Sequence, residues 1–116
     1  MNHDLETLTQ QLRDFAKARD WGQFHSPKNL ASALTVEAAE LLEHFQWMTE
    51  DQSRHLSEVK RGEISAEVAD VFLYILQLCD GLGIDLVEAA RTKIASNAAK
   101  YPVELARGNS KKYSEF

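Results

Sequence analysis

The segment from about Glu63 to Leu82 limits most strongly how this chain can fold. After Val68, its side chains are apolar on almost every side of a helix. Such a helix is stable only when it is buried between other elements. The sequence therefore predicts a helix at the centre of a core, which Gly81 and Gly83 end because glycine favours helix termination.

Two helices are predicted before this segment. Apolar residues recur at helical spacing near the N-terminus, which predicts an amphipathic helix over about residues 4–19. The residues of this stripe are Leu5, Leu8, Leu12 and Phe15. Ser26-Pro27 has the form of an N-cap followed by proline at the first helical position, so a second helix is expected to run to about Met48.

Two capping boxes predict two more helices. Thr49-Glu50-Asp51-Gln52 is expected to open a short helix that ends near Lys60-Arg61-Gly62. Asp85-Leu86-Val87-Glu88 is expected to open the last main helix, which ends before Tyr101-Pro102 because proline cannot continue a helix. The polar tail, about residues 103–116, is expected to be extended over the surface.

The chain is thus predicted to be an all-α protein with a four-helix bundle-like fold in a single domain, residues 1–116. Strict alternation of apolar and polar residues, the pattern of a half-buried strand, is nowhere sustained. Three partner helices are hardly enough to cover an apolar central helix in so short a chain. A homo-oligomer is therefore expected rather than a monomer.

The charge of the chain limits its partners. The formal net charge is −5, and no run of five or more Lys or Arg residues occurs. A surface that binds DNA or RNA normally needs a basic stripe, so no nucleic acid polymer is expected as a partner. An acidic protein that binds a polyphosphate needs bridging cations or a few well-placed lysines to offset repulsion. Metal dependence is therefore an early hypothesis.

The sequence also bears on location. Met1-Asn2-His3-Asp4 lacks the basic start and the apolar core of a signal peptide, and no stretch reaches the roughly 18 apolar residues of a membrane span. We expect a cytoplasmic protein with no membrane partner. Cys79 is the single cysteine and lies in an apolar run, so it is interpreted as a buried core thiol.

Two pairs of acids carry the chemistry that the sequence suggests. Glu37 and Glu40 lie on the second helix, and Glu67 and Asp70 lie on the central one. Residues three apart share a helix face, so each pair presents two carboxylates side by side. Four acids that meet inside a bundle repel unless a cation neutralises them, and hard oxygen ligands favour Mg²⁺ or Mn²⁺.

An alternative is that the acids of the second helix form an ordinary solvated face, which Glu43 prolongs. This alternative is weaker for Glu67 and Asp70, because unpaired carboxylates are rare in so apolar a helix. Other templates are absent from the sequence. It contains no Glu-x-x-His of di-iron bundles, no His-Glu-x-x-His, no paired cysteines and no P-loop.

The acid pattern, Glu-x-x-Glu followed by Glu-x-x-Asp in a short helical chain, resembles that of the MazG-like nucleotide pyrophosphohydrolase family. The resemblance extends over nearly the whole chain and is closest to the dCTP pyrophosphatase branch. Its further segments are Trp21-Gly22-Gln23-Phe24-His25 with Pro27 and Asn29, Phe45-Gln46-Trp47, Asp70-Val71-Phe72-Leu73-Tyr74, Lys93 with Asn97, Tyr101-Pro102-Val103, and Arg107-Gly108 with Lys112-Tyr113.

This resemblance implies a homotetrameric all-α enzyme that cleans the nucleotide pool. It implies Mg²⁺-dependent hydrolysis of a deoxynucleoside triphosphate, dCTP or a modified dCTP, to the monophosphate and pyrophosphate. The catalytic residues and metal ligands that it implies are Glu37, Glu40, Glu67 and Asp70. One of these carboxylates orients the attacking water, and the sequence leaves open which one does so.

The resemblance also implies the residues that bind the nucleotide. Lys93 and Asn97, four apart on the last helix, are expected to reach the phosphates, and Tyr74 the sugar or phosphates. Trp21 and Trp47 are expected to offer aromatic faces to the base, with His25 near the same pocket. Trp47 is expected two helical turns beyond Glu40, roughly 10 Å along the same helix.

Two positions depart from the family pattern, and the milder change is Lys100 in place of an expected arginine. The resemblance implies a base-proximal histidine on the first helix where this chain has Leu12. This leaves open which nucleotide is preferred, including the other canonical dNTPs and methylated or oxidised nucleotides. A second alternative is a non-catalytic helical module that binds a nucleotide or a protein partner and uses its acids only structurally.

Overall fold

The computed structural model describes residues 3–115, in which helices are the only regular elements, as predicted for an all-α chain. The contacts divide the described residues into two units, residues 3–84 and residues 85–115, and each is described by itself. None of the helices within residues 3–115 is long and apolar enough to cross a membrane.

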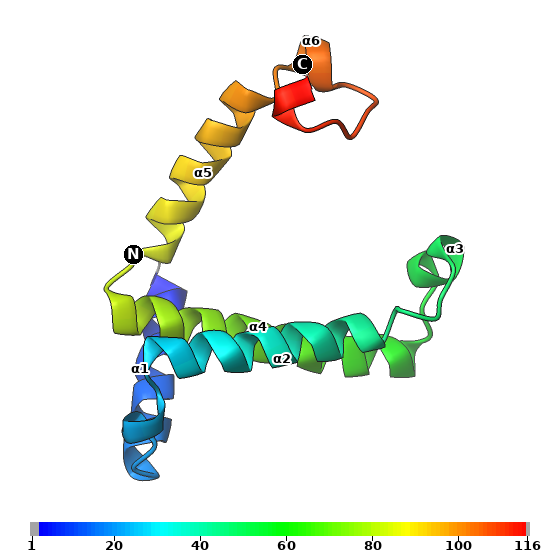
Figure 1. Cartoon of the computed structure of the whole chain (residues 1–116). Coiled ribbons are helices and arrows are strands. Elements are labelled where there is room, and N and C mark those ends of the chain that lie inside the picture. Colours follow the sequence, from blue (N-terminus) through cyan, green and yellow to red (C-terminus); the bar gives the residue numbers. More distant parts are fainter. Residues whose placement is uncertain (1–2, 116) are drawn as a thin grey trace. The chain divides into compact units, whose positions relative to one another are not determined.

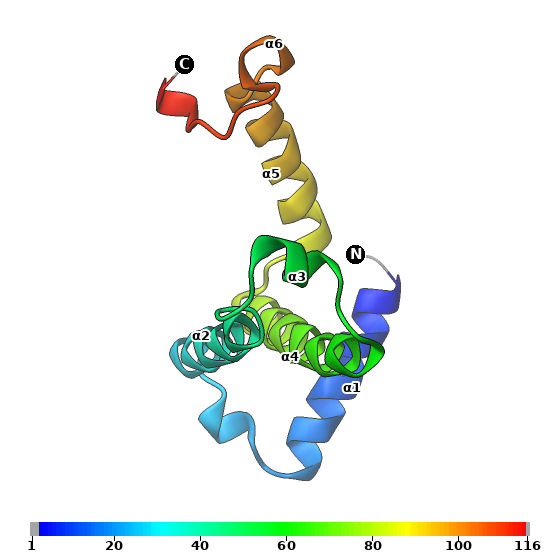
Figure 2. The same cartoon turned by 90° about the vertical axis from the view of Figure 1, so that its right-hand side faces the viewer.

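The first unit is built on two long helices, α2 and α4, which lie side by side and run in opposite directions (Figures 1 and 2). Helix α1 packs against the other side of α4, so α4 is the central helix, as the sequence predicts. The elements of this unit are α1 (His3–Ala18), the short 3₁₀ helix η1 (Gly22–Phe24), α2 (Pro27–Glu43), α3 (Glu50–Arg54) and α4 (Glu58–Leu82).

Polar caps fix where the helices of this unit begin. The Ser26 hydroxyl accepts a hydrogen bond from the Asn29 amide at the start of α2, with Pro27 in the first turn. At the start of α3, Thr49 and Gln52 form both bonds of a capping box. Both starts agree with the sequence analysis.

The predicted end of α3 is wrong. The third helix ends at Arg54, not near Lys60-Arg61-Gly62, and α4 begins at Glu58. The reason is a second cap: the Ser57 hydroxyl accepts a hydrogen bond of 3.2 Å from the Lys60 amide. Gly62 therefore lies inside α4 rather than at a helix end.

The predicted end of α2 is also wrong. The helix ends at Glu43 instead of Met48, and residues 44–48 form a turn. The His44 amide donates to the Leu41 oxygen and the Phe45 amide to the Leu42 oxygen, which are the tighter bonds of a closing helix. Aromatic side chains lose rotamer freedom in helices, so this aromatic-rich stretch favours the turn.

Helix α4 ends as predicted at glycine. Gly83 adopts the left-handed conformation with φ of 67°, and the Ile84 amide donates a hydrogen bond of 2.9 Å to the Cys79 oxygen. A left-handed residue at this position satisfies carbonyls that the helix leaves free, and glycine adopts it without a Cβ clash. Gly81 lies inside the helix, so Gly83 alone provides the stop.

The second unit begins with α5 (Leu86–Lys100), which Asp85 caps by accepting a hydrogen bond from the Glu88 amide. The helix ends before Tyr101-Pro102, as predicted. The tail is not simply extended, because it contains α6 (Val103–Ala106) and the 3₁₀ helix η2 (Tyr113–Glu115). Tyr113 packs edge-on against Tyr101 at 6.3 Å between ring centroids, which folds the tail back on the end of α5.

The core of the single chain is thin. Among residues 3–115, Leu30 and Leu76 are the buried apolar side chains, each 3% exposed. Val68 of α4 is 48% exposed, so the central helix is only partly covered within one chain. Cys79 is half-buried, and burial raises the pKa of its thiol, which fits the predicted core role better than a reactive one.

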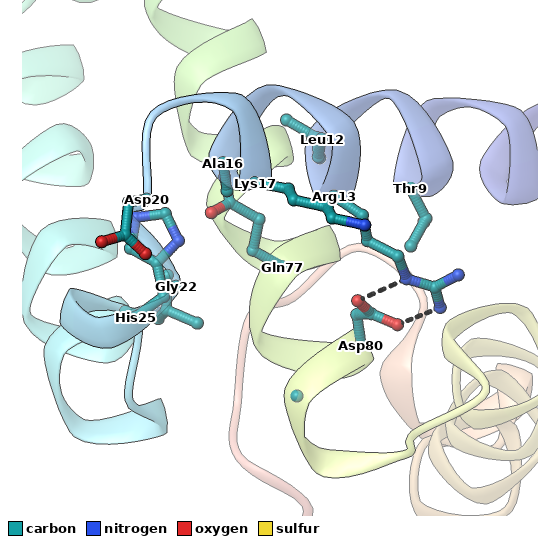
Figure 3. Close-up of a pocket in the computed structure, with 12 residues that line it drawn as sticks. Thr9, Leu12, Arg13, Ala16, Lys17, Asp20, Gly22, His25, Gln77 and Asp80 are labelled. Atoms are coloured by element: carbon teal, nitrogen blue, oxygen red, sulfur yellow. Dashed lines mark hydrogen bonds and ion pairs between the residues drawn. The ribbon is translucent and has the colours of Figure 1, made fainter.

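An ion pair between Arg13 and Asp80 joins α1 to the C-terminal end of α4. The Arg13 guanidinium donates two parallel hydrogen bonds to the Asp80 carboxylate, one of them from Nε to Oδ2 at 2.9 Å (Figure 3). Hydrogen bonding to Arg13 lowers the pKa of Asp80 from its ordinary value of 3.8. The fork fixes both distance and orientation, which a single ionic contact does not.

We predict that Asp80→Asn lowers the melting temperature, because it removes one partner of this fork. A lowered pKa in the folded state means that the contribution is present above the unfolded value of 3.8 and is lost as the pH falls through the lowered folded value. The difference in melting temperature between the wild type and the variant should therefore shrink in acid. Glu6→Gln, which removes the same charge from an exposed side of α1, is the control and should show neither effect.

Candidate metal and nucleotide site

Three of the four predicted acids meet between α2 and α4. Carboxylate oxygens of Glu37, Glu67 and Asp70 all lie within 4.8 Å of one another. Glu37 and Glu67 are half-buried, and Asp70 is exposed. The spacing of three residues on each helix, together with the antiparallel packing of α2 and α4, brings these side chains to one place.

The fourth acid, Glu40, lies within reach of the same cluster. The pKa of Glu67 is raised to about 7, first by hydrogen bonding with Glu40 and then by burial and the charge of Glu37. Burial, followed by the interaction with Glu40, also raises the pKa of Glu37. These carboxylates are therefore difficult to ionise together without a compensating charge.

Two oxygens of the cluster are buried without a hydrogen-bond partner: Glu37 Oε2 and Glu67 Oε1. A bond between two carboxyl groups exists only while one of them holds a proton, so the ionised cluster lacks donors for these atoms. Buried carboxylate oxygens without donors are costly unless a cation contacts them. Oxygen ligands at this spacing fit Mg²⁺ or Mn²⁺, the metals expected from the sequence.

We predict that the metal-free protein loses stability as the pH rises from about 4.5 to about 7. A raised folded-state pKa means that Glu67 stabilises the fold below its unfolded value, and that this contribution is lost as the pH rises through the folded value. The check is chemical denaturation in EDTA across this range.

Glu67→Gln should flatten the dependence of unfolding free energy on pH, because its amide does not titrate. Glu43→Gln is the matched control, since Glu43 continues the row of acids on α2 but is outside the three-residue cluster. A profile for Glu67→Gln as steep as that of the wild type would contradict the assignment of this titration to Glu67.

A cavity of about 400 Å³ adjoins the acid cluster. It lies between α1 and α4 and shares Asp70 with the cluster. Four of the residues expected to act on substrate line it: Trp21, His25, Asp70 and Tyr74. The structure thus brings acidic, aromatic and imidazole side chains from two separate segments, α4 and the connection between α1 and α2, into one cavity.

The segment between α1 and α2 places Trp21 and His25. Asp20 adopts a left-handed conformation with φ of 55°, and the Trp21 amide donates a hydrogen bond of 2.9 Å to the Ala16 oxygen. The Trp21 ring then packs edge-on against Phe15 at 5.6 Å and His25 at 6.4 Å between centroids. Trp21 remains 44% exposed, so part of its surface is open to a ligand.

Trp47 is not among the residues that line this cavity. It lies in the turn after α2, beyond the end of the helix that was expected to carry it, and it is 89% exposed. The placement two helical turns beyond Glu40 is therefore wrong. Lys93 and Asn97 are exposed and four apart on α5, as expected, in the second unit.

Sequence reasoning singled out Leu12 as a departure from the family pattern, but it did not single out Gln77. Leu12 belongs to the wall of this cavity, and Gln77 of α4 also lines it. The stripe on α1 predicted that Leu12 faces inward but not which cavity it meets. Gln77 lies seven residues beyond Asp70, a helical spacing that could have been noticed in the sequence.

Residues 33–116 match the MazG-like family model. This chain is 39% identical to dCTP pyrophosphatase 1 of Homo sapiens over 97% of its own length and 67% of that protein. It is 38% identical to dCTP pyrophosphatase 1 of Mus musculus over the same shares of the two chains. The chain belongs to the MazG-like family.

A solved structure agrees with this assignment. A crystal structure of a pyrophosphatase from Archaeoglobus fulgidus is similar to this chain with a TM-score of 0.82 and 43% sequence identity. The similarity covers 88% of this chain and 95% of the archaeal one. The all-α fold is thus that of a MazG-like pyrophosphatase.

Proposed function

We propose that this MazG-like protein hydrolyses dCTP, or a modified dCTP, to the monophosphate and pyrophosphate in a Mg²⁺-dependent reaction. Its relatives support the class of reaction, pyrophosphohydrolysis of a nucleoside triphosphate. The observation that carries the proposal is the position of the acid cluster beside a cavity that Trp21 lines. The proposed setting is the cytoplasmic nucleotide pool.

Glu37, Glu40, Glu67 and Asp70 would hold Mg²⁺. When bound there, the ion supplies charge neutralisation and polarises phosphoryl oxygens. One of the carboxylates would orient a water toward the α-phosphorus and take up the proton that this water loses. A bond forms from the water oxygen to the α-phosphorus, and the bond to the bridging oxygen breaks, so pyrophosphate leaves.

The other proposed contacts follow the parts of the nucleotide. Asp70 and Tyr74 lie one helical turn apart on α4 and line the same cavity, which suits the phosphates and the sugar. Trp21, with His25 beside it, would meet the base, and Trp47 would offer a second aromatic face. Lys93 and Asn97 of α5 would bind the phosphate chain.

We further propose a homotetramer as the working assembly. The single chain leaves large apolar side chains exposed on several helices, and exposed apolar surface is typical of subunit interfaces. The most exposed on the α-helices of the first unit are Val36, Leu42, Val59 and Leu82.

The proposed function is tested with a panel of nucleoside triphosphates, with and without Mg²⁺. We expect dCMP and pyrophosphate as the first products from dCTP, and no turnover in EDTA. Chromatography of the reaction mixture identifies the products directly. Appearance of dCDP and orthophosphate would contradict attack on the α-phosphorus.

Asp70→Asn provides the matched control, because it removes a charge from the cluster and preserves the size of the side chain. We expect it to abolish turnover and leave the circular dichroism spectrum unchanged. Nucleotide binding without turnover by the wild type would favour a non-catalytic binding module instead.

We predict that Trp47→Ala raises KM for dCTP by about one to two powers of ten and changes kcat much less, since an aromatic face contributes on the order of 1–3 kcal/mol per stacked base. A core tryptophan would cost about 3–5 kcal/mol of stability on truncation. Trp47 is 89% exposed within the chain, so the melting temperature should change little. A large loss of melting temperature with an unchanged substrate ranking would identify Trp47 as an interface residue.

A further inference from the structure

Gln77 is a polar side chain that lines the cavity between α1 and α4. The lining that α1 contributes is largely apolar and includes Leu8, Leu12 and Phe15. Gln77 is half-buried there, and its amide makes no hydrogen bond within residues 3–115. A half-buried amide that lacks a partner has unused capacity to bind a ligand.

The position of Gln77 along α4 is a second observation. It follows Tyr74 by three residues and Asp70 by seven, so all three share one face of the helix, and all three line the cavity. Seven residues correspond to roughly 10 Å of helix rise. This is about the distance that separates the α-phosphate of a nucleotide from its base, so phosphates near Asp70 place a base near Gln77.

The surroundings of Gln77 are suited to a base. Figure 3 shows its side chain extending from α4 toward α1 near Ala16, and Leu12 and His25 line the same space. Trp21 also lines the cavity and offers an aromatic face. Stacking holds a base without distinguishing its polar edge, so a hydrogen-bonding group is needed for selection.

We propose that Gln77 binds the polar edge of the base and helps to determine which nucleotide is hydrolysed. A carboxamide donates through Nε2 and accepts through Oε1, which matches the acceptor at N3 and the amino donor at N4 of cytosine. This inference rests on the proposed function, because it requires a nucleotide whose phosphates lie at the acid cluster.

The test compares Gln77→Met with the wild type on each dNTP and on 2-deoxyribose 5-triphosphate, which carries the sugar and phosphates without a base. Methionine has similar length and suits a half-buried helical site, so the fold should survive. We expect kcat/KM for dCTP to fall by about tenfold to a hundredfold, mainly through KM. The rate with the base-free triphosphate should be unchanged.

Gln77→Glu retains the size of the side chain and replaces the amide donor with an acceptor, so it should change the ranking among dNTPs. Gln11→Met is the matched control, because Gln11 lines the same cavity from α1 and is exposed. It should leave the ranking of dNTPs unchanged.

Two outcomes would overturn the assignment of Gln77 while the enzyme stays active. One is an unchanged ranking in both Gln77 variants, and the other is an equal loss on dCTP and on the base-free triphosphate, which would indicate a structural role. A ranking that changes in Gln11→Met and not in Gln77→Met would assign selection to α1. Absence of hydrolysis by the wild type across the whole panel would overturn the proposed function, and the assignment of Gln77 with it.

Discussion

Glu37 on α2 meets Glu67 and Asp70 on α4 with carboxylate oxygens within 4.8 Å of one another. Like charges at this distance oppose the packing of the two helices on which the first unit is built. Packing of the apolar faces must exceed this repulsion, or a proton or a cation must relieve it. Because a metal ion that binds the folded cluster and not the unfolded chain adds its binding free energy to stability, the fold and the site are coupled.

One face of helix α4 contributes side chains to both parts of the candidate site, the acid cluster and the cavity. Asp70 belongs to the acid cluster and to the cavity, Tyr74 lies one turn further, and Gln77 nearly one turn beyond that. Of these three side chains only the carboxylate next to the cluster carries charge, and the phenol and the amide beyond it are neutral. A ligand that is charged at one end and aromatic at the other matches this arrangement, and a nucleoside triphosphate has that form.

Much of the fold could be predicted from local signals. Ser26, Thr49 and Asp85 cap helices where the sequence indicates, and Gly83 ends α4. The errors came where two signals compete within a few residues. Ser57 follows Thr49 closely and begins α4 five residues early, and an aromatic-rich stretch ends α2 before the next capping box. Helical periodicity alone does not decide such competitions.

Those features of the site that depend on the spacing of residues along one helix could be predicted from the sequence. Residues three apart on each helix explain why the acids form pairs, but their meeting depends on the antiparallel packing of α2 and α4, which no local pattern specifies. Trp21 reaches the cavity through the left-handed conformation at Asp20, which the sequence analysis did not anticipate. The resemblance to a family supplied the predicted role of Trp21, which stays a prediction, and the structure supplied its position.

The partial exposure of α4 bears on whether the chain associates with further copies of itself. A chain of this size must offset the conformational entropy of its ordered residues chiefly through apolar burial, and here Leu30 and Leu76 are the buried apolar side chains of residues 3–115. Helix α4, which carries Glu67 and Asp70, therefore needs apolar contacts in addition to those with α1 and α2. If a second copy of the chain supplies that cover, association stabilises the helix that holds the carboxylates, and the geometry of the acid cluster becomes a property of the assembly as well as of the chain.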